Sequence, residues 1–169
     1  MGASASFPLQ VFRFLVEFAQ VSLSDDSPGD PMNVCNGAFA ECTGLEATME
    51  AKVIKEGGRN YGPAQRAGQT SFATVVLKRG IGQADLWKIF NAIATGTFAP
   101  RLQVKISIFA PDENGVPQGV LAWQLDRAMP VKYKFADLNA RGTEVGIEEL
   151  HLVHEGLSAV APAASLQAT

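Results

Sequence analysis

The sequence predicts a mainly β protein, an antiparallel β-sandwich or barrel of about seven strands with one flanking α-helix and a long β-hairpin. Three observations predict this fold. Apolar and polar residues alternate in several segments, with the period of a half-buried strand. Only residues 85–96 show the apolar spacing of a helix. Runs rich in Gly, Pro, Asn and Asp separate these segments and indicate turns.

Length and composition fit a single globular domain. The chain has 169 residues, of which 47% are hydrophobic and 18% are charged. We expect one domain over residues 1–169, with an ordered core of about residues 11–157 and flexible termini. The net charge of -3 gives no general attraction to nucleic acid or to an anionic membrane.

The first predicted strand covers residues 11–18, where Phe12, Phe14, Val16 and Phe18 form one strongly apolar face. Residues 22–37 mix Ser, Asp, Pro, Gly and Asn and predict a long loop. Three acidic residues in this loop lack the regular spacing and the terminal Glu of an EF-hand, so a solvated loop is favoured over a calcium site. They are Asp25, Asp26 and Asp30.

A long hairpin follows. Residues 39–56 alternate, so that one face has Ala47, Met49, Ala51 and Val53 and the other has Glu46, Thr48, Glu50 and Lys52. Residues 70–80 are also strand-like, and the Gly-rich segment 57–69 between them predicts a flexible tip. Because a lone hairpin is marginally stable in water, one with an apolar stripe needs another surface to pack against.

The predicted helix presents Leu86, Ile89, Phe90 and Ile93 on one face for packing. Burial is also favoured for Trp87 on this helix and for Trp123 on a later strand. The preceding glycines, Gly80 and Gly82, match two positions of a dinucleotide-binding motif. The third position is Asp85, which suits a helix N-terminus and would repel a phosphate, so this turn is predicted to bind no nucleotide.

The remaining segments predict a second hairpin and two further strands. Residues 101–109 alternate, residues 111–119 form a turn, and residues 120–128 return along the first arm. In residues 101–109 the apolar face is Leu102, Val104, Ile106 and Ile108. Residues 131–135 and 144–153 then form the last strands, joined by the polar link 136–142. Strands dominate this order of elements, which favours an antiparallel fold.

No constellation of residues predicts catalysis, metal binding or a cofactor. His151 and His154 point to opposite faces of a strand, so they cannot jointly hold one metal. Glu149 and His151 can share a hydrogen bond, but no nucleophile accompanies them. Free thiols are favoured for Cys35 and Cys42. Two basic pairs are predicted to be solvated or ion-paired on strands: Lys78 with Arg79, and Lys132 with Lys134.

Five segments in consistent order resemble one family. They read FAECTGLEATMEAKVIKEGGRN, LKRG, LWKIFNAI, MPVKYKFADLNA and EELHLVHEGL. Together they resemble the inner tube protein of contractile phage tails and of phage-tail-like contractile injection systems, over about residues 11–157. The resemblance implies a structural subunit without enzymatic activity. It also implies hexameric rings in which neighbouring sheets join into one inner barrel and which stack into a hollow tube.

The resemblance gives the hairpin residues expected roles. Glu46, Thr48, Glu50 and Lys52 would face the lumen, while Ala47, Met49, Ala51 and Val53 would support self-assembly by packing outward against the subunit's own body. The tip would meet the next ring through a stacking loop of Gly57, Gly58, Arg59 and Asn60. Closing hairpins and sheets into a ring removes exposed strand edges, which otherwise promote aggregation.

The expected partners are further copies of the chain, a surrounding sheath protein, baseplate and terminator proteins, and protein cargo or phage DNA in the lumen. The N-terminal segment lacks the basic start of a secretion signal. We therefore expect assembly in the bacterial cytoplasm, no direct membrane anchor, and a final place in a virion or a released phage-tail-like particle. Two alternatives are a tube-like ring protein of type VI secretion and a small monomeric β-barrel binding module.

Overall fold

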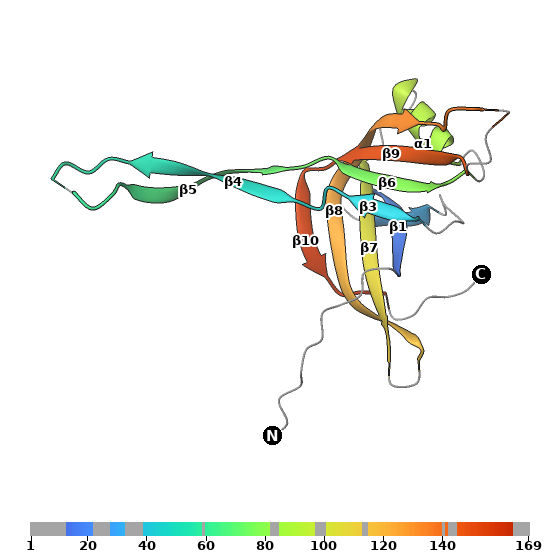
Figure 1. The fold of residues 1–169 in the computed structure, drawn as a ribbon, viewed down its shortest axis with the longest axis horizontal. Coiled ribbons are helices and arrows are strands. Elements are labelled where there is room, and N and C mark those ends of the chain that lie inside the picture. The colour runs from blue at the N-terminus through green and yellow to red at the C-terminus, as the bar shows by residue number, and fades with distance from the viewer. Residues whose placement is uncertain are drawn as a thin grey trace.

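The computed structural model describes residues 13–21, 28–32, 39–58, 60–81, 85–96, 101–112, 115–139, 141 and 145–163. These residues form ten strands and one helix (Figure 1). In chain order they are β1 (Phe14–Val21), β2 (Pro28–Met32), β3 (Glu41–Thr43), β4 (Ala47–Ile54), β5 (Ala64–Phe72), β6 (Val75–Gly80), α1 (Asp85–Ala94), β7 (Arg101–Pro111), β8 (Pro117–Lys134), β9 (Ile147–Val153) and β10 (Gly156–Val160).

Two antiparallel sheets form the body and share the long strand β8. Sheet A contains β2, β1, β7, the first half of β8, and β10. Sheet B contains the second half of β8, then β9, β6 and β3. Their strands cross at a steep angle (Figure 1), as in orthogonal sandwiches whose corners are strands that pass from one sheet to the other. At this corner Arg127 has a positive φ of 51°.

The core lies between the two sheets and under α1. Sheet A contributes buried side chains such as Val104 and Leu125, and sheet B contributes Leu77 and Leu150. Side chains from both sheets thus belong to one apolar cluster of described residues. Leu86 of α1 is fully buried in the same cluster.

The structure merges two predicted strands and adds two others. Residues 120–128 and 131–135 were predicted separately, but β8 runs unbroken through Pro130. A register shift between Pro130 and Lys132 lets the ladder with β9 continue past the proline. Within the predicted loop 22–37, β2 pairs with β1 at the edge of sheet A, where proline is tolerated in a strand. Sequence reasoning also missed β10, which pairs with β8.

The predicted hairpin is split into two parts. β3 and β6 belong to sheet B, whereas β4 and β5 pair only with each other and form a separate two-stranded sheet. Gly44 lies at this junction with a φ of +87°, and a Cβ there would come within 2.1 Å of the Thr74 carbonyl oxygen. Glycine is the residue that permits both the backbone conformation and this close approach. The tip is also shorter than predicted, because residues 64–69 belong to β5.

Strand β1 is displaced from its predicted bounds and keeps its predicted apolar face. It begins at Phe14, while Phe12 lies outside the described residues. Val16 and Phe18 are buried, and Phe14 packs against the same core.

Strand β7 follows its predicted apolar face over most of its length. Leu102, Val104 and Ile106 are buried, as predicted. A register shift between Ile108 and Phe109 then turns Phe109 inward in place of Ile108.

Candidate assembly surface

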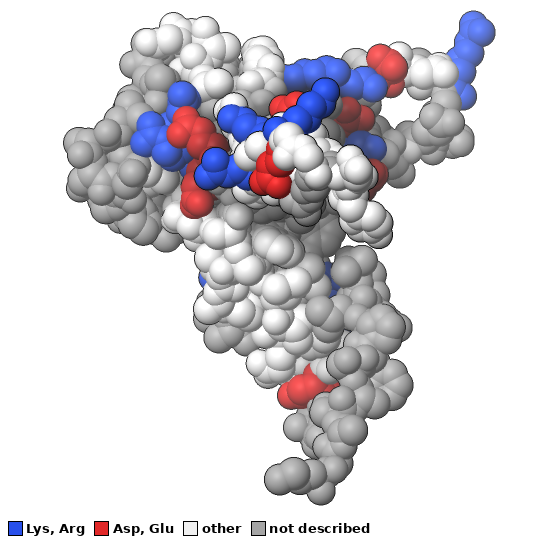
Figure 2. Space-filling model, turned by 90° about the vertical axis from the view of Figure 1, so that its left-hand side faces the viewer, with Lys and Arg blue, Asp and Glu red and all other residues white. Residues whose placement is uncertain are grey.

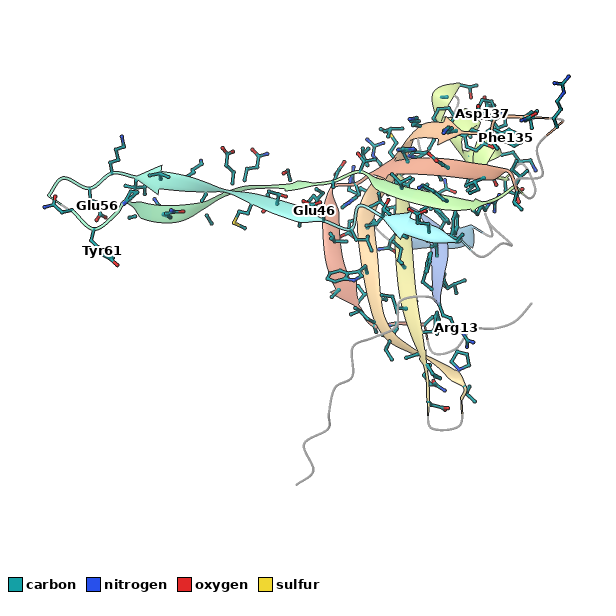
Figure 3. All side chains as sticks on the ribbon, viewed as in Figure 1. Arg13, Glu46, Glu56, Tyr61, Phe135 and Asp137 are labelled. Atoms are coloured by element: carbon teal, nitrogen blue, oxygen red, sulfur yellow. The ribbon has the colours of Figure 1, made fainter. Side chains whose placement is uncertain are left out.

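The β4–β5 hairpin is the most exposed described part of the molecule. It projects sideways from the body as a long arm (Figure 1), and all eight residues of β4 are exposed. Figure 3 shows Glu46 at the root of the arm and Glu56 and Tyr61 near its tip, far from the body. An isolated two-stranded sheet gains little stability in water by itself.

One face of the hairpin is polar and includes the residues predicted to face a lumen. Thr48 Oγ1 donates a hydrogen bond of 3.4 Å to Glu46 Oε1, so both side chains lie on this face. Glu50 and Lys52 follow at alternate positions of β4. The pairing with β5 adds Ser71 opposite Thr48 and Arg66 opposite Lys52. Sequence reasoning missed Arg66 because residues 57–69 were assigned to the tip.

The opposite face is apolar and exposed. Ala47, Met49, Ala51 and Val53 lie there, opposite Phe72, Thr70, Ala67 and Gln65 of β5. Met49 and Val53 each expose 56% of their surface. The expectation that these residues pack against the subunit's own body is therefore wrong, because the arm extends away from that body. Exposed apolar surface of this kind is typical of protein–protein contact sites.

A β-bulge divides the arm. Met49 is paired with Thr70 and Ala51 with Ala67, so β5 has one extra residue opposite Glu50. A Cβ on Gly68 would come within 2.0 Å of the Glu50 carbonyl oxygen, so the bulge requires glycine there. At the tip, Gly57 and Gly58 form a turn and Asn60 is exposed, while Arg59 lies outside the described residues. Tyr61 is 96% exposed beside them.

Helix α1 covers the core at the other end of sheet B. Leu86 and Ile89 are buried, Ile93 packs against the core, and Phe90 contacts the Tyr133 ring at a centroid distance of 6.5 Å. The expected burial of Trp87 is wrong, because this side chain is 46% exposed and touches Phe90 and Tyr133 from outside. Trp123 is half-buried.

Beneath α1, three polar side chains form a network on the inner face of sheet B. Arg79 and Glu148 are 5% and 1% exposed and form an ion pair. Tyr133 Oη donates a hydrogen bond of 2.8 Å to Glu148 Oε2. Burial and the hydrogen bond to Glu148 raise the pKa of Tyr133 to about 12. This network holds β6, β8 and β9 together from within.

Among the described residues, the two histidines each lie near one polar neighbour. His151 Nε2 lies 3.4 Å from Glu149 Oε2, and His154 Nδ1 lies 2.9 Å from the Gly156 carbonyl oxygen. The described residues contain no group of three or more His, Cys, Asp or Glu side chains placed to hold a metal ion. Burial raises the pKa of the Cys42 thiol to about 11. Asp25, Asp26, Cys35 and Gly82 lie outside the described residues, as does the side chain of Asp30.

In the described part of the chain, sheet B ends in two strand edges that have no further backbone partner. Among the described residues, β3 pairs only with β6, and the second half of β8 pairs only with β9. Figure 2 looks along the arm and shows charged side chains over the arm and the adjoining body, while the lower body is mostly uncharged on its described surface. No helix among the described residues is long and apolar enough to cross a bilayer.

Solved structures with the same fold come from contractile injection systems. A chain in the cryo-EM structure of the anti-feeding prophage (AFP) baseplate, 6-fold symmetrised, is 28% identical, with a TM-score of 0.72 over 92% of this chain and 97% of that one. A chain of the sheath–tube complex of an extracellular contractile injection system, PVC, in its extended state, is 18% identical, with a TM-score of 0.68 over 93% and 94%. One from the PVC sheath/tube terminator is 18% identical, with a TM-score of 0.71 over 94% and 100%.

More distant similarity extends to type VI secretion. A chain described as the structure of a type six secretion system protein is 10% identical, with a TM-score of 0.50 over 87% of this chain and 83% of that one. No functionally curated protein matches the sequence significantly. The family model of the T4-like virus tail tube protein gp19 matches residues 10–158, nearly the whole chain. The chain therefore belongs to this tail tube family, whose members are structural proteins and not enzymes.

Proposed function

We propose that this tail tube protein assembles as hexameric rings that stack into the hollow inner tube of a contractile injection system or phage tail. Protein cargo or DNA passes through this tube when a surrounding sheath contracts. The observation that carries the proposal is the β4–β5 arm, in which β4 is exposed along its whole length and neither strand pairs with a strand of the body. The six-fold symmetrised structure containing the 28% identical chain supports the ring number.

The open edges of sheet B support ring closure. An unpaired strand edge carries free N–H and C=O groups and invites pairing with another chain. Head-to-tail contact between the β3 edge of one copy and the β8 edge of the next satisfies both edges, and rotation closes the series into a ring. In this arrangement sheet B of every copy contributes to one inner barrel.

The two faces of the arm support distinct roles. The polar face, with Glu46, Thr48, Glu50 and Lys52, lines the water-filled lumen, and Arg66 and Ser71 join it there. The apolar face, with Met49 and Val53 at its centre, packs on neighbouring subunits. Gly57, Gly58, Arg59 and Asn60 at the tip contact the adjacent ring. Two acids and two bases on the lumen face leave it without strong attraction to either sign of cargo.

Partners and location follow from this assembly. A sheath surrounds the tube, and baseplate and terminator proteins bind its two ends. The similar chains support these partners, because they belong to the AFP baseplate, the PVC sheath–tube complex and the PVC sheath/tube terminator. The subunits assemble in the bacterial cytoplasm and end in a virion or a released phage-tail-like particle. Because the tube is a passive conduit, the chain needs no cofactor.

Purified protein tests the proposal directly. Size-exclusion chromatography with light scattering should detect species of six subunits as the concentration rises, and negative-stain microscopy should show rings or stacked tubes. Co-expression with sheath and baseplate proteins supplies a template if assembly requires one. A chain that stays monomeric at its solubility limit and also in that co-expression would contradict the proposal and favour a monomeric binding module.

A further inference from the structure

Charged side chains form an ordered row across the exposed face of sheet B. Lys134 on β8 is the direct partner of Glu149 on β9, Glu149 is the partner of Lys78 on β6, and Lys78 is the partner of Glu41 on β3. The signs therefore alternate across all four strands. Opposite charges at such cross-strand positions stabilise a sheet, whereas like charges destabilise it.

The two ends of the row differ in their pairing. Lys78 Nζ lies 3.1 Å and 3.2 Å from the two carboxylate oxygens of Glu41. At the opposite edge, Lys132 and Lys134 are exposed and have no hydrogen bond or ion pair among the described residues. Sheet B thus presents a carboxylate on its β3 edge and, on its β8 edge, two ammonium groups that have no partner in the described part of the chain.

Strand direction allows these edges to meet. The four strands of sheet B alternate in direction, so β3 runs opposite to β8. When β3 of one copy lies beside β8 of the next, the contact is again antiparallel, and the alternation continues through any number of copies. Contacts between two β3 edges or two β8 edges would place like charges together.

Register also favours this contact. The side chains of Lys132 and Lys134 are two residues apart and point to the same face of the sheet. A shift of one residue would turn a whole strand inside out, so neighbouring copies can differ only by two-residue steps. In two successive registers Glu41 of one copy therefore meets a lysine of the other.

We propose that Glu41 on the β3 edge of one copy pairs with Lys132 or Lys134 on the β8 edge of the next copy. This pairing extends the alternating row around the ring and fixes the head-to-tail direction of subunit contact. It rests on the proposed ring and names the residues that close it. The occupant of the lysine edge is a second copy of this chain, and binding of a nucleic acid at those lysines is the competing outcome.

Two complementary variants test the pairing. Glu41→Lys places a cation on both edges, and Lys132→Glu/Lys134→Glu places anions on both edges. Each variant alone should lose assembly by roughly tenfold or more, because like charges now meet at every contact. An equimolar mixture should assemble, since each edge then finds an opposite charge on the other variant. A ring of six accommodates strict alternation of the two variants.

The control is Lys78→Gln. It removes the ion pair with Glu41 inside one subunit, as Glu41→Lys does, but leaves both edges unchanged and should assemble like the wild type. Circular dichroism and thermal melting establish that each variant is folded, and light scattering with negative-stain microscopy measures assembly. Short duplex DNA, added to wild-type protein in a separate arm, tests whether the lysine edge binds nucleic acid.

The outcomes separate the inference from the proposed function. The pairing is supported if the wild type forms rings, if each folded variant alone does not assemble, and if the mixture of the two variants forms rings. The pairing is overturned if either variant assembles alone or if the mixture stays unassembled. It is also overturned if Lys132 and Lys134 are needed for DNA binding but not for assembly. A wild-type chain that never forms rings overturns the proposed function, and the pairing with it.

Disulfide trapping provides a second test if a reversed-charge variant does not fold. In a chain with Cys35 and Cys42 replaced by alanine, the pair Glu41→Cys with Lys134→Cys should oxidise into a ladder of covalent oligomers. Glu41 and Lys134 of one subunit are three strand spacings apart, about 14 Å, too far for a disulfide within the chain. The same ladder from Glu41→Cys with Lys132→Cys would assign the other register, and monomers in both cases would overturn the pairing.

Discussion

Arg79 on β6 and Glu148 on β9 are direct cross-strand partners, and Arg79 Nε donates a hydrogen bond of 2.5 Å to Glu148 Oε1 at a site almost sealed from water. Tyr133 of β8 donates to the other carboxylate oxygen, and the guanidinium carbon of Arg79 lies 5.9 Å from the centre of the Phe39 ring. Because one residue of slip would separate these charges, the pair fixes the register of the strands proposed to line the tube.

Glu148→Ala should lower the free energy of unfolding by about 3–5 kcal/mol, because it leaves the buried Arg79 charge without its carboxylate. Urea unfolding followed by circular dichroism measures the change. Lys78→Gln breaks an exposed pair and should cost about 1 kcal/mol or less. The double variant Arg79→Met/Glu148→Leu should recover much of the loss, and equal effects of Glu148→Ala and Lys78→Gln would contradict the account.

Tyr133 makes the free energy of unfolding depend on pH in the alkaline range. Its folded-state pKa of about 12 lies above the ordinary value of 10.0, so the neutral form is favoured in the folded protein. The resulting stabilisation is complete below about pH 10 and is lost as the pH rises toward 12. The stability difference between wild type and Tyr133→Phe should therefore shrink over this range.

Absorbance at 295 nm tests the same pKa more directly. The chain has two tyrosines, so Tyr61→Phe leaves Tyr133 as the only phenol that titrates. Its half-ionisation should fall near pH 12 in the folded protein and near pH 10 in urea. A folded-state midpoint near pH 10 would show that Glu148 and burial do not act on this hydroxyl as described.

Gly44→Ala should destabilise the protein by about 2 kcal/mol or more, because the new Cβ meets the Thr74 carbonyl and the positive φ disfavours any other residue. Gly57→Ala is the matched control, since a Cβ there has nothing within 4 Å and its φ is not positive. Chemical unfolding of the two variants measures the difference. Equal stability would mean that the junction between sheet B and the arm tolerates a side chain.

Cys42 should react slowly with thiol reagents. Burial raises its pKa from 9.0 to about 11, which lowers the thiolate fraction near neutral pH roughly a hundredfold. In a Cys35→Ser chain, modification by a chromogenic disulfide at pH 7.5 should be slow in buffer and fast in urea. Rapid labelling of the folded protein would show that β3 exposes this thiol.

The alternation and helical spacing of apolar residues correctly predicted the elements whose buried face can be read from their own sequence. The apolar faces of β1 and β7 were visible as alternation, and Leu86 and Ile89 stand at helical spacing. These patterns could not show that one strand is shared by the two sheets. The sequence of β8 predicts two strands separated at Met129 and Pro130, and a bulge allows them to form one continuous strand. Strand β10 was missed because its pairing with β8 is tertiary and its five residues, GLSAV, carry little pattern.

The hairpin at the candidate site was also only partly predictable from the sequence. Its two faces were predictable, since Met49 and Val53 alternate with Glu50 and Lys52. Its separation from the body was not, because that depends on the conformation of Gly44 and on where β3 and β6 pair. Arg66 was missed because residues 57–69 were assigned to the tip, whereas the structure pairs Arg66 with Lys52 beyond the bulge.

If the apolar face of the arm builds the tube, negative-stain microscopy of the Met49→Asp/Val53→Asp variant is the most direct measurement of its role. Burying unpaired carboxylates at every subunit contact is costly, so this variant should fold as the wild type does yet form no rings or tubes. Thr48→Asp, on the polar face of the same strand, is the control and should assemble normally. Unchanged rings or tubes from the Met49→Asp/Val53→Asp variant would contradict the account.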